Sequence, residues 1–139
     1  KEIFDKAYLS KYEYLEVDSK IKLQKPFSTS KMLNKEYSVL EDDESSGTYL
    51  TYNVSIGTSL DPKRYLALDI LDYVLCSSPG AVLKEALIKA GIGEDVYNIG
   101  DTGIFQPYIG IVAKNAKEEQ KDTFVSIIFD EVIYFLLCC

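Results

Sequence analysis

The order in which hydrophobic patterns follow one another is the feature of this sequence that most constrains its fold. Apolar and polar residues alternate over 50–56, which predicts a strand with one buried face. Two helical patterns come next, then two further strands near 95–99 and 104–112, and a last helix over 117–137. Because this is not a regular alternation of strand and helix, we expect an α+β fold, with a mainly antiparallel sheet and helices packed on one face.

Capping residues mark where the two middle helices begin and end. Asp61-Pro62 is typical of a helix start, with Asp as the N-cap and Pro at the first helical position. The second helix is expected to begin at Ser78-Pro79 and to end at Gly91. The first helix should bury an apolar stripe and expose charged side chains. The predicted stripe is Leu66, Ile70, Tyr73 and Val74, widened by Leu68, Leu71 and Leu75, and the predicted exposed side carries Lys63, Arg64, Asp69 and Asp72.

The last predicted strand contains Pro107, which cannot donate a ladder hydrogen bond, so we expect that strand to be an edge strand or bulged. Residues 100–103 predict the turn before it. Within this turn, Asp101-Thr102-Gly103 matches the triplet of aspartic peptidases, in which two aspartates share a proton. A single copy would require a homodimer. The same triplet is good turn chemistry, so Asp101 has a catalytic interpretation and a turn interpretation, of which we favour the turn.

Three other candidate sites have simpler structural interpretations. Gly91-Ile92-Gly93 follows a helix rather than a strand, which is the wrong order for a dinucleotide-binding loop and favours a helix end. The acidic run Glu41–Glu44 lacks the spaced ligand pattern of calcium loops, which favours a solvated turn. Cys76 has no histidine and no nearby lysine to activate its thiol, so we expect a small buried residue.

Composition narrows the function further. The chain has 139 residues, enough for one domain, and a net charge of −7, which disfavours nucleic acid as a partner. It contains no histidine, which removes His-based acid–base catalysis and every metal site that uses His. The three cysteines lack zinc-ligand spacing and favour a reducing compartment such as the cytoplasm. We expect no signal peptide and no membrane span, because the longest apolar run, Val132–Cys139, has eight residues against the ~18 that a span needs.

Charge and periodicity both divide the chain near residue 37. Residues 1–37 carry eight lysines against six acidic residues, whereas the remainder is acidic. Residues 1–9 predict one or two turns of helix, and residues 10–37 predict an extended segment, called the connector below. The last helix is apolar almost all round from Phe124 onward, and such a helix normally lies inside a larger structure. We therefore expect 38–139 to form an α+β domain that is incomplete at its C-terminal end.

Residues 73–96 combine a leucine-rich helix, a Ser-Pro start and the pattern Leu-Lys-x-Ala-Leu-Ile-x-x-Gly-Ile-Gly-x-Asp. This stretch resembles the pitrilysin or insulinase superfamily of zinc metallopeptidases, in its presequence-protease branch. Shorter pieces at Tyr8–Tyr12, Leu23–Phe27 and Gln106-Pro107 are similar too, so the resemblance covers roughly residues 1–125. The matching residues of the main stretch are Ser78, Pro79, Leu83, Lys84, Ala86, Leu87, Ile88, Gly91, Gly93 and Asp95.

The resemblance implies a part of the family that does not carry the catalytic centre. Family members hold zinc through His-x-x-Glu-His and a distal Glu, and this chain has no His, so no catalytic, cofactor-binding or metal-binding residue is carried over. Residues 1–37 would be the tail helix of the catalytic domain plus the connector, and 38–139 the second, non-catalytic domain. The parent would be a zinc metalloendopeptidase whose two halves enclose a chamber for unfolded peptides, with this inert domain as wall and scaffold.

Two alternatives stay open. The chain could be a freestanding protein-interaction module on the same fold, holding a partner through an exposed edge near Pro107 or through its last helix. It could also be a homodimeric aspartic peptidase through Asp101. The partners we expect are the remaining domains of the parent, unfolded peptide in that parent, and a second copy of this chain through the apolar last helix, with no nucleic acid and no membrane.

Overall fold

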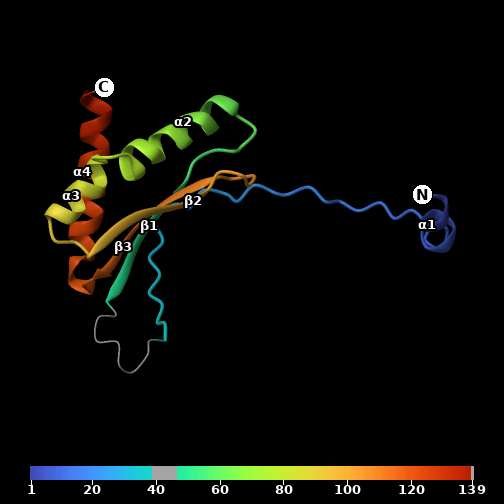
Figure 1. Cartoon of the computed structure of the whole chain (residues 1–139), viewed down its shortest axis with the longest axis horizontal. Helices are drawn as coiled ribbons and strands as arrows, with labels where there is room; N and C mark the ends of the chain where they lie inside the picture. The colour runs from blue at the N-terminus through green and yellow to red at the C-terminus, as the bar shows by residue number, and fades with distance from the viewer. Residues whose placement is uncertain (39–46, 139) are drawn as a thin grey trace.

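The computed structural model describes residues 1–38 and 47–138 of the chain. A sheet and its helices occupy the C-terminal part, and an extended segment leads from them to a short N-terminal helix (Figure 1). The predicted acidic turn at Glu41–Glu44 lies outside the described residues. In chain order the elements are α1 (Glu2–Ala7), the 3-10 turn η1 (Leu9–Lys11), β1 (Thr48–Ser55), α2 (Pro62–Asp72), the π-helical turn η2 (Tyr73–Ser77), α3 (Val82–Lys89), β2 (Asp95–Asp101), β3 (Tyr108–Ala116), the 3-10 turn η3 (Glu118–Gln120) and α4 (Lys121–Cys138).

The sheet has three strands in the order β1-β3-β2, and both pairings are antiparallel. The register aligns Tyr52 of β1 and Asn98 of β2 with Ile111 of the central strand. One face of this sheet packs against η2, α3 and α4 to form the core. The α+β class, the antiparallel sheet and the helices on one face are therefore confirmed. The core residues are Leu50, Leu75, Cys76, Leu83, Leu87, Ile92, Val96, Ala113, Ala116, Phe124 and Ile128.

The alternating pattern of β1 predicts one face that is buried along the whole strand. In the structure, only the first part of that face is buried. Leu50 is buried and Tyr52 is partly buried, with its ring edge-on to Phe129 of α4 at a centroid distance of 5.6 Å. Val54 and Ile56, which continue the same alternation, are exposed. The core helices cover the sheet at the Leu50 end, so apolar residues toward the other end of β1 stay open.

Pro107 does not lie in an edge strand or at a bulge, so that prediction is wrong. The last strand begins one residue later, at Tyr108, and it is the central strand. Pro107 is fully buried immediately before it, and its carbonyl accepts a hydrogen bond from Ser55 Oγ at 2.9 Å. A proline that precedes a strand costs no ladder hydrogen bond, which explains how a central strand accommodates it.

The predicted helix caps are largely confirmed. Asp61 Oδ1 accepts a hydrogen bond from the Arg64 backbone N–H at 3.1 Å, and Pro62 is the first helical residue. At the other end of α3, Ile92 N–H donates to the Leu87 carbonyl and Gly91 takes a positive φ, as in a Schellman cap. The start of α3 is corrected, because residues 78–81 form a turn and the helix begins only at Val82.

The predicted buried stripe of α2 is only partly correct. Leu66, Ile70 and Tyr73 are 57%, 55% and 56% exposed, and we call these three residues the α2 outer face. Leu68 and Leu75, which the prediction also placed in the stripe, are buried, and the inward side of the helix also carries Asp72, which was predicted to face solvent. This helix has apolar residues on two faces, so periodicity alone could not select which face packs on the sheet.

The stretch Pro62–Lys89 is the one described helical segment that is long and apolar enough, by length and composition, to cross a membrane. The chain turns at residues 78–81, so this segment is not one straight helix. Its first continuous piece consists of α2, with 11 residues, and η2, with 5 residues. At 1.5 Å per residue that piece is about 24 Å long, short of the roughly 30 Å hydrocarbon layer. Its end carries Leu75 and Cys76 into the core, so we interpret the stretch as packed helices of this fold.

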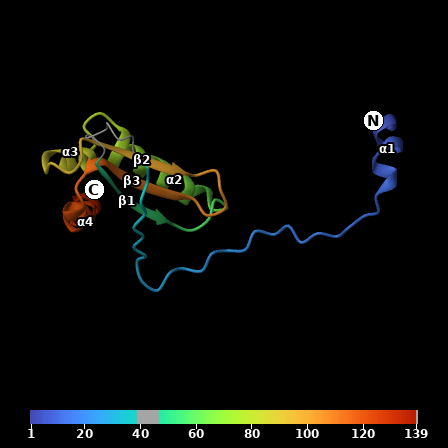
Figure 2. The same ribbon diagram turned by 90° about the horizontal axis from the view of Figure 1, so that it is seen from below.

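The connector contains no helix or strand from Tyr12 to Tyr37, while its first two residues belong to the 3-10 turn η1. It runs from the sheet toward α1, which lies far from the other helices in both views (Figures 1 and 2). Near its middle, the backbone of Gln24 contacts the side chain of Gln106 in the loop between β2 and β3. A domain boundary near residue 37 stays a prediction.

Candidate functional site

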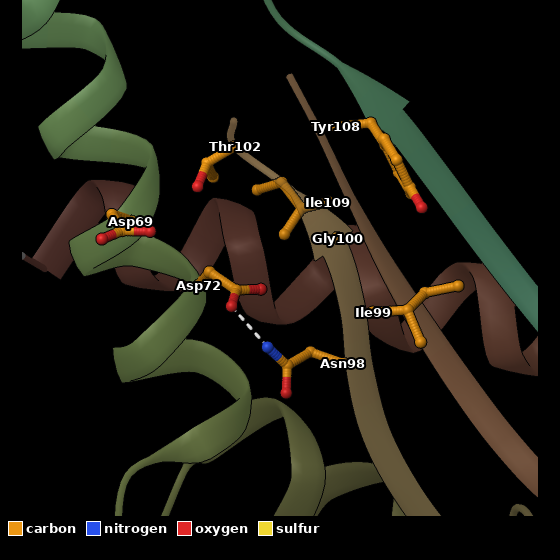
Figure 3. A pocket seen from close by; sticks show the side chains of 8 residues that line it. All are labelled: Asp69, Asp72, Asn98, Ile99, Gly100, Thr102, Tyr108 and Ile109. Carbon is orange, nitrogen blue, oxygen red and sulfur yellow. Dashed lines mark hydrogen bonds between the residues drawn. The ribbon is translucent and has the colours of Figure 1, made fainter. Parts of the chain in front are cut away.

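The main candidate site is a pocket of about 430 Å³ between α2 and β2, called the α2–β2 pocket below. It lies beside the part of the sheet that the core helices leave open. Asp72 points from α2 toward Asn98 of β2 across this pocket, and Asp69 lies one turn earlier on the same helix (Figure 3). The lining residues are Asp69, Asp72, Asn98, Ile99, Gly100, Thr102, Tyr108 and Ile109.

Asp72 is the least satisfied polar group of this pocket. Its Oδ2 accepts a short hydrogen bond from Asn98 Nδ2, while its Oδ1 is buried and has no hydrogen-bond partner within the described residues. Burial raises the pKa of the Asp72 carboxyl above its ordinary 3.8, the hydrogen bond from Asn98 lowers the pKa, and the charge of Asp69 raises it. The ionised carboxylate is therefore destabilised where it lies.

Asn98 connects this pocket to a second hollow of about 660 Å³ between α3, the turn after η2 and β2. Its Oδ1 accepts a hydrogen bond from Ser77 Oγ at 3.0 Å, while its Nδ2 donates to Asp72. One amide thus joins η2, the end of α2 and the edge strand β2. The arrangement explains why Asp72 faces inward, since its carboxylate is the acceptor for the partly buried Asn98 amide.

Asp101, the candidate of the aspartic-peptidase hypothesis, lies at the end of β2 and outside the α2–β2 pocket. Its neighbours Gly100 and Thr102 line the pocket, whereas Asp101 is not among the lining residues. Its Oδ1 accepts a hydrogen bond from the Gly103 backbone N–H at 2.8 Å. This is an Asx turn, so the triplet has the turn role that we favoured.

Cys76 is buried in the core, as predicted. Burial, together with the charge of Asp72, raises the pKa of the Cys76 thiol from 9.0 to about 12. A thiol with so high a pKa carries almost no thiolate near neutral pH, and the thiolate is the reactive form. The position therefore suits packing rather than chemistry.

The residues that the structure describes do not fit a zinc ion. The sequence has no histidine, and the described residues contain no group of three His, Cys, Asp or Glu side chains placed to hold a metal. The acidic run Glu41–Glu44, considered for calcium, lies outside the described residues. Any zinc chemistry in a larger protein would therefore need ligands from other segments.

Exposed apolar side chains are the second functional feature. Besides the α2 outer face, α4 exposes Phe129, Ile133 and Leu137, which we call the α4 outer face. Both sets follow helical spacing, so each forms a stripe along its helix. Helix stripes of this kind are typical of surfaces that pack against other protein.

Fold and site together define a class of protein: an α+β domain without a recognisable catalytic set among its described residues, and with apolar faces suited to packing. The family model described as the Peptidase M16 inactive domain matches residues 2–136, and the chain belongs to this family. The resemblance to the pitrilysin or insulinase superfamily is thereby confirmed, and the chain is a non-catalytic metallopeptidase domain.

Two curated relatives agree with this assignment. The chain is 36% identical over 130 residues to Protein HypA of Clostridium perfringens, covering 93% of this chain and 13% of that protein. It is 31% identical over 115 residues to Presequence protease 1, chloroplastic/mitochondrial, of Arabidopsis thaliana, covering 81% of this chain and 11% of that protein. The chain thus corresponds to a small part of each relative.

The sequence indicated the family of this domain but not its pocket. Asp69 and Asp72 were assigned to the solvent side of their helix, and Asn98 was not singled out. The pairing of Asp72 with Asn98 joins positions 26 residues apart, so no local pattern reveals it. One available signal was the second apolar face of α2, which left the orientation of that helix open.

Proposed function

We propose that this chain is a wall and scaffold domain of a zinc metallopeptidase that degrades peptides, and that it is inert by itself. The observation that carries the proposal is the pair of exposed apolar faces on α2 and α4 in a domain of the M16 inactive family. A folded domain that works alone rarely exposes large contiguous apolar stripes. Here those stripes are the surfaces on which the rest of the parent packs.

The lengths of the relatives support a larger parent. This chain spans 13% of HypA and 11% of the presequence protease, so most of each relative lies outside the matched region. In our proposal the zinc ligands and the catalytic carboxylate come from that remainder, because this chain supplies no histidine. The domain contributes one wall of a chamber around an unfolded peptide, and its core keeps that wall rigid.

The partners follow from the two outer faces. Other domains of the parent cover the α2 outer face and the α4 outer face, and in their absence a second copy of the chain covers the α4 outer face. We expect the isolated chain to self-associate with rising concentration and to bind hydrophobic dyes. Sedimentation of a clean monomer that ignores such dyes would contradict this part of the proposal.

The test is a complementation assay. The isolated chain, with and without added zinc, is mixed with a fluorogenic peptide, and the same chain is then co-expressed with the remaining segments of its parent. We expect no cleavage by the chain alone and zinc-dependent cleavage by the reassembled protein. Zinc-dependent cleavage by the chain alone would overturn the proposal.

A pair of variants tests which surface is used. Ile70→Glu places a charge on the α2 outer face, while Ile88→Glu places the same charge at an exposed apolar position of α3, outside both named outer faces. Both variants should remain folded, and only Ile70→Glu should lose complementation.

The same surfaces favour one other candidate, a freestanding interaction module, though its predicted edge near Pro107 is excluded by the central position of β3. The gene upstream of Lys1 separates the two candidates. A His-x-x-Glu-His motif in the preceding reading frame supports the peptidase domain, and a start codon at Lys1 supports the module.

A further inference from the structure

The loop between β2 and β3 presents a side-chain amide to the connector. The Gln24 backbone N–H donates to Gln106 Oε1 at 2.6 Å, and Gln106 Nε2 donates to the Gln24 carbonyl at 3.3 Å. These two bonds join positions 82 residues apart. The amide therefore pairs with both backbone groups of one residue, as a neighbouring strand does in a sheet.

The loop that carries Gln106 is held by the domain on both sides of that residue. Ser59 N–H donates to the Phe105 carbonyl at 3.0 Å, and Ser55 Oγ donates to the Pro107 carbonyl at 2.9 Å. Pro107 itself is fully buried. Gln106 thus extends from a backbone fixed at both neighbouring residues, which reduces the entropy lost when its amide binds.

The connector is suited to this contact through its backbone rather than its side chains. Pro26 biases Lys25 toward an extended conformation, and an extended backbone presents its N–H and C=O groups outward. Leu23 and Phe27, on either side of Gln24, remain exposed, so apolar burial does not hold this segment. Among the described connector residues, the middle is joined to the sheet domain by the two bonds between Gln24 and Gln106, and Tyr37 at its end donates through its Oη to the Gly47 carbonyl at 2.6 Å.

We propose that the side-chain amide of Gln106 is the anchoring site for the middle of the connector, which it binds through the backbone of Gln24. The partner of this site is an extended segment of the same chain, recognised by its peptide group and not by its side chain. The contact between Gln106 and Gln24 fixes the point at which the connector leaves the sheet. It therefore sets the direction of the part of the chain before Gln24. It depends only on contacts within this chain and is independent of the proposed chamber role.

The test is hydrogen exchange at the Gln24 amide in the 139-residue chain, read by NMR. Gln106→Ala removes both bonds, and the ordinary strength of a hydrogen bond predicts exchange faster by about two- to thirteenfold. Gln106→Glu keeps the acceptor for this N–H, so the Gln24 amide should stay protected. Backbone order of residues 22–25 on the ps–ns timescale should fall in Gln106→Ala alone.

Two further variants separate anchoring from general loss of stability. Gln120→Ala is the matched control, because Gln120 also accepts from one backbone N–H, of Lys117, and donates to one carbonyl, of Gly91, away from the connector. It should leave Gln24 exchange unchanged. Gln24→Ala should keep the protection of that amide, since only its backbone is bound. Unchanged exchange in Gln106→Ala, equal acceleration in Gln120→Ala, or loss of protection in Gln24→Ala would each overturn the proposal.

Discussion

The orientation of α2 can be tested with two leucines on the same helix. Leu66 and Leu68 both belong to the stripe that the sequence predicts to be buried, yet Leu66 is 57% exposed and only Leu68, at 6%, is buried. Leu→Ala at a buried site costs about 2–5 kcal/mol, because it removes transfer free energy and leaves a cavity. Leu66→Ala removes a side chain that is mostly in water and should cost at most about 1 kcal/mol.

The assay is equilibrium urea unfolding followed by circular dichroism. At a slope of about 2 kcal/mol per molar, Leu68→Ala should lower the midpoint by about 1–2.5 M, and Leu66→Ala by less than about 0.5 M. Helix propensity does not separate the two variants, since each makes the same Leu→Ala change inside one helix. Equal losses, or a larger loss for Leu66→Ala, would refute the orientation of α2, and with it the α2–β2 pocket and the α2 outer face.

Three further predictions concern single groups. Because the pKa of Asp72 is raised in the folded state, its stability contribution is greatest below 3.8 and falls as pH rises through the folded pKa, so Asp72→Asn should flatten urea midpoints measured from pH 3.5 to 7. With the two C-terminal cysteines changed to serine, Cys76 should react with a thiol reagent only on unfolding, because the rise from 9.0 to about 12 reduces thiolate roughly a thousandfold. Gly93→Ala should cost about 1–3 kcal/mol more than Gly91→Ala in urea unfolding, because both have positive φ but only at Gly93 does the added Cβ meet a backbone oxygen, that of Lys114, at 2.7 Å.

Local chemistry explains which parts of this fold the sequence could predict. The Asp61 cap, the Gly91 helix end and the Asx turn of Asp101 each depend on hydrogen bonds within five residues, and each was predicted. The strand before the helices and the apolar last helix were also predicted, because their patterns repeat over many residues. The residues of 73–96 indicated the family, because they form one continuous pattern along the chain.

Long-range pairing explains what the sequence could not predict. Pro107 sits beside a central strand because Tyr108, not Ile104, begins the ladder, and only the partners on both sides determine that choice. The inward position of Asp72 depends on Asn98, and the anchor of the connector depends on Gln106 meeting Gln24. Single-chain periodicity carries no information about such partners.

The second apolar face of α2 links the failed prediction to the proposed function. A helix that packs on one sheet needs one apolar stripe, and Leu68 with Leu75 already supplies it. Leu66, Ile70 and Tyr73 add a stripe that this domain leaves in water, which is costly for an isolated protein and useful for one that packs on both sides. The two apolar faces of α2, which made its orientation ambiguous from the sequence, are therefore what a scaffold domain between two protein layers requires. In the parent that we propose, both stripes are buried. The stripe of Leu68 and Leu75 packs inside this domain, and the α2 outer face packs on another domain of the parent.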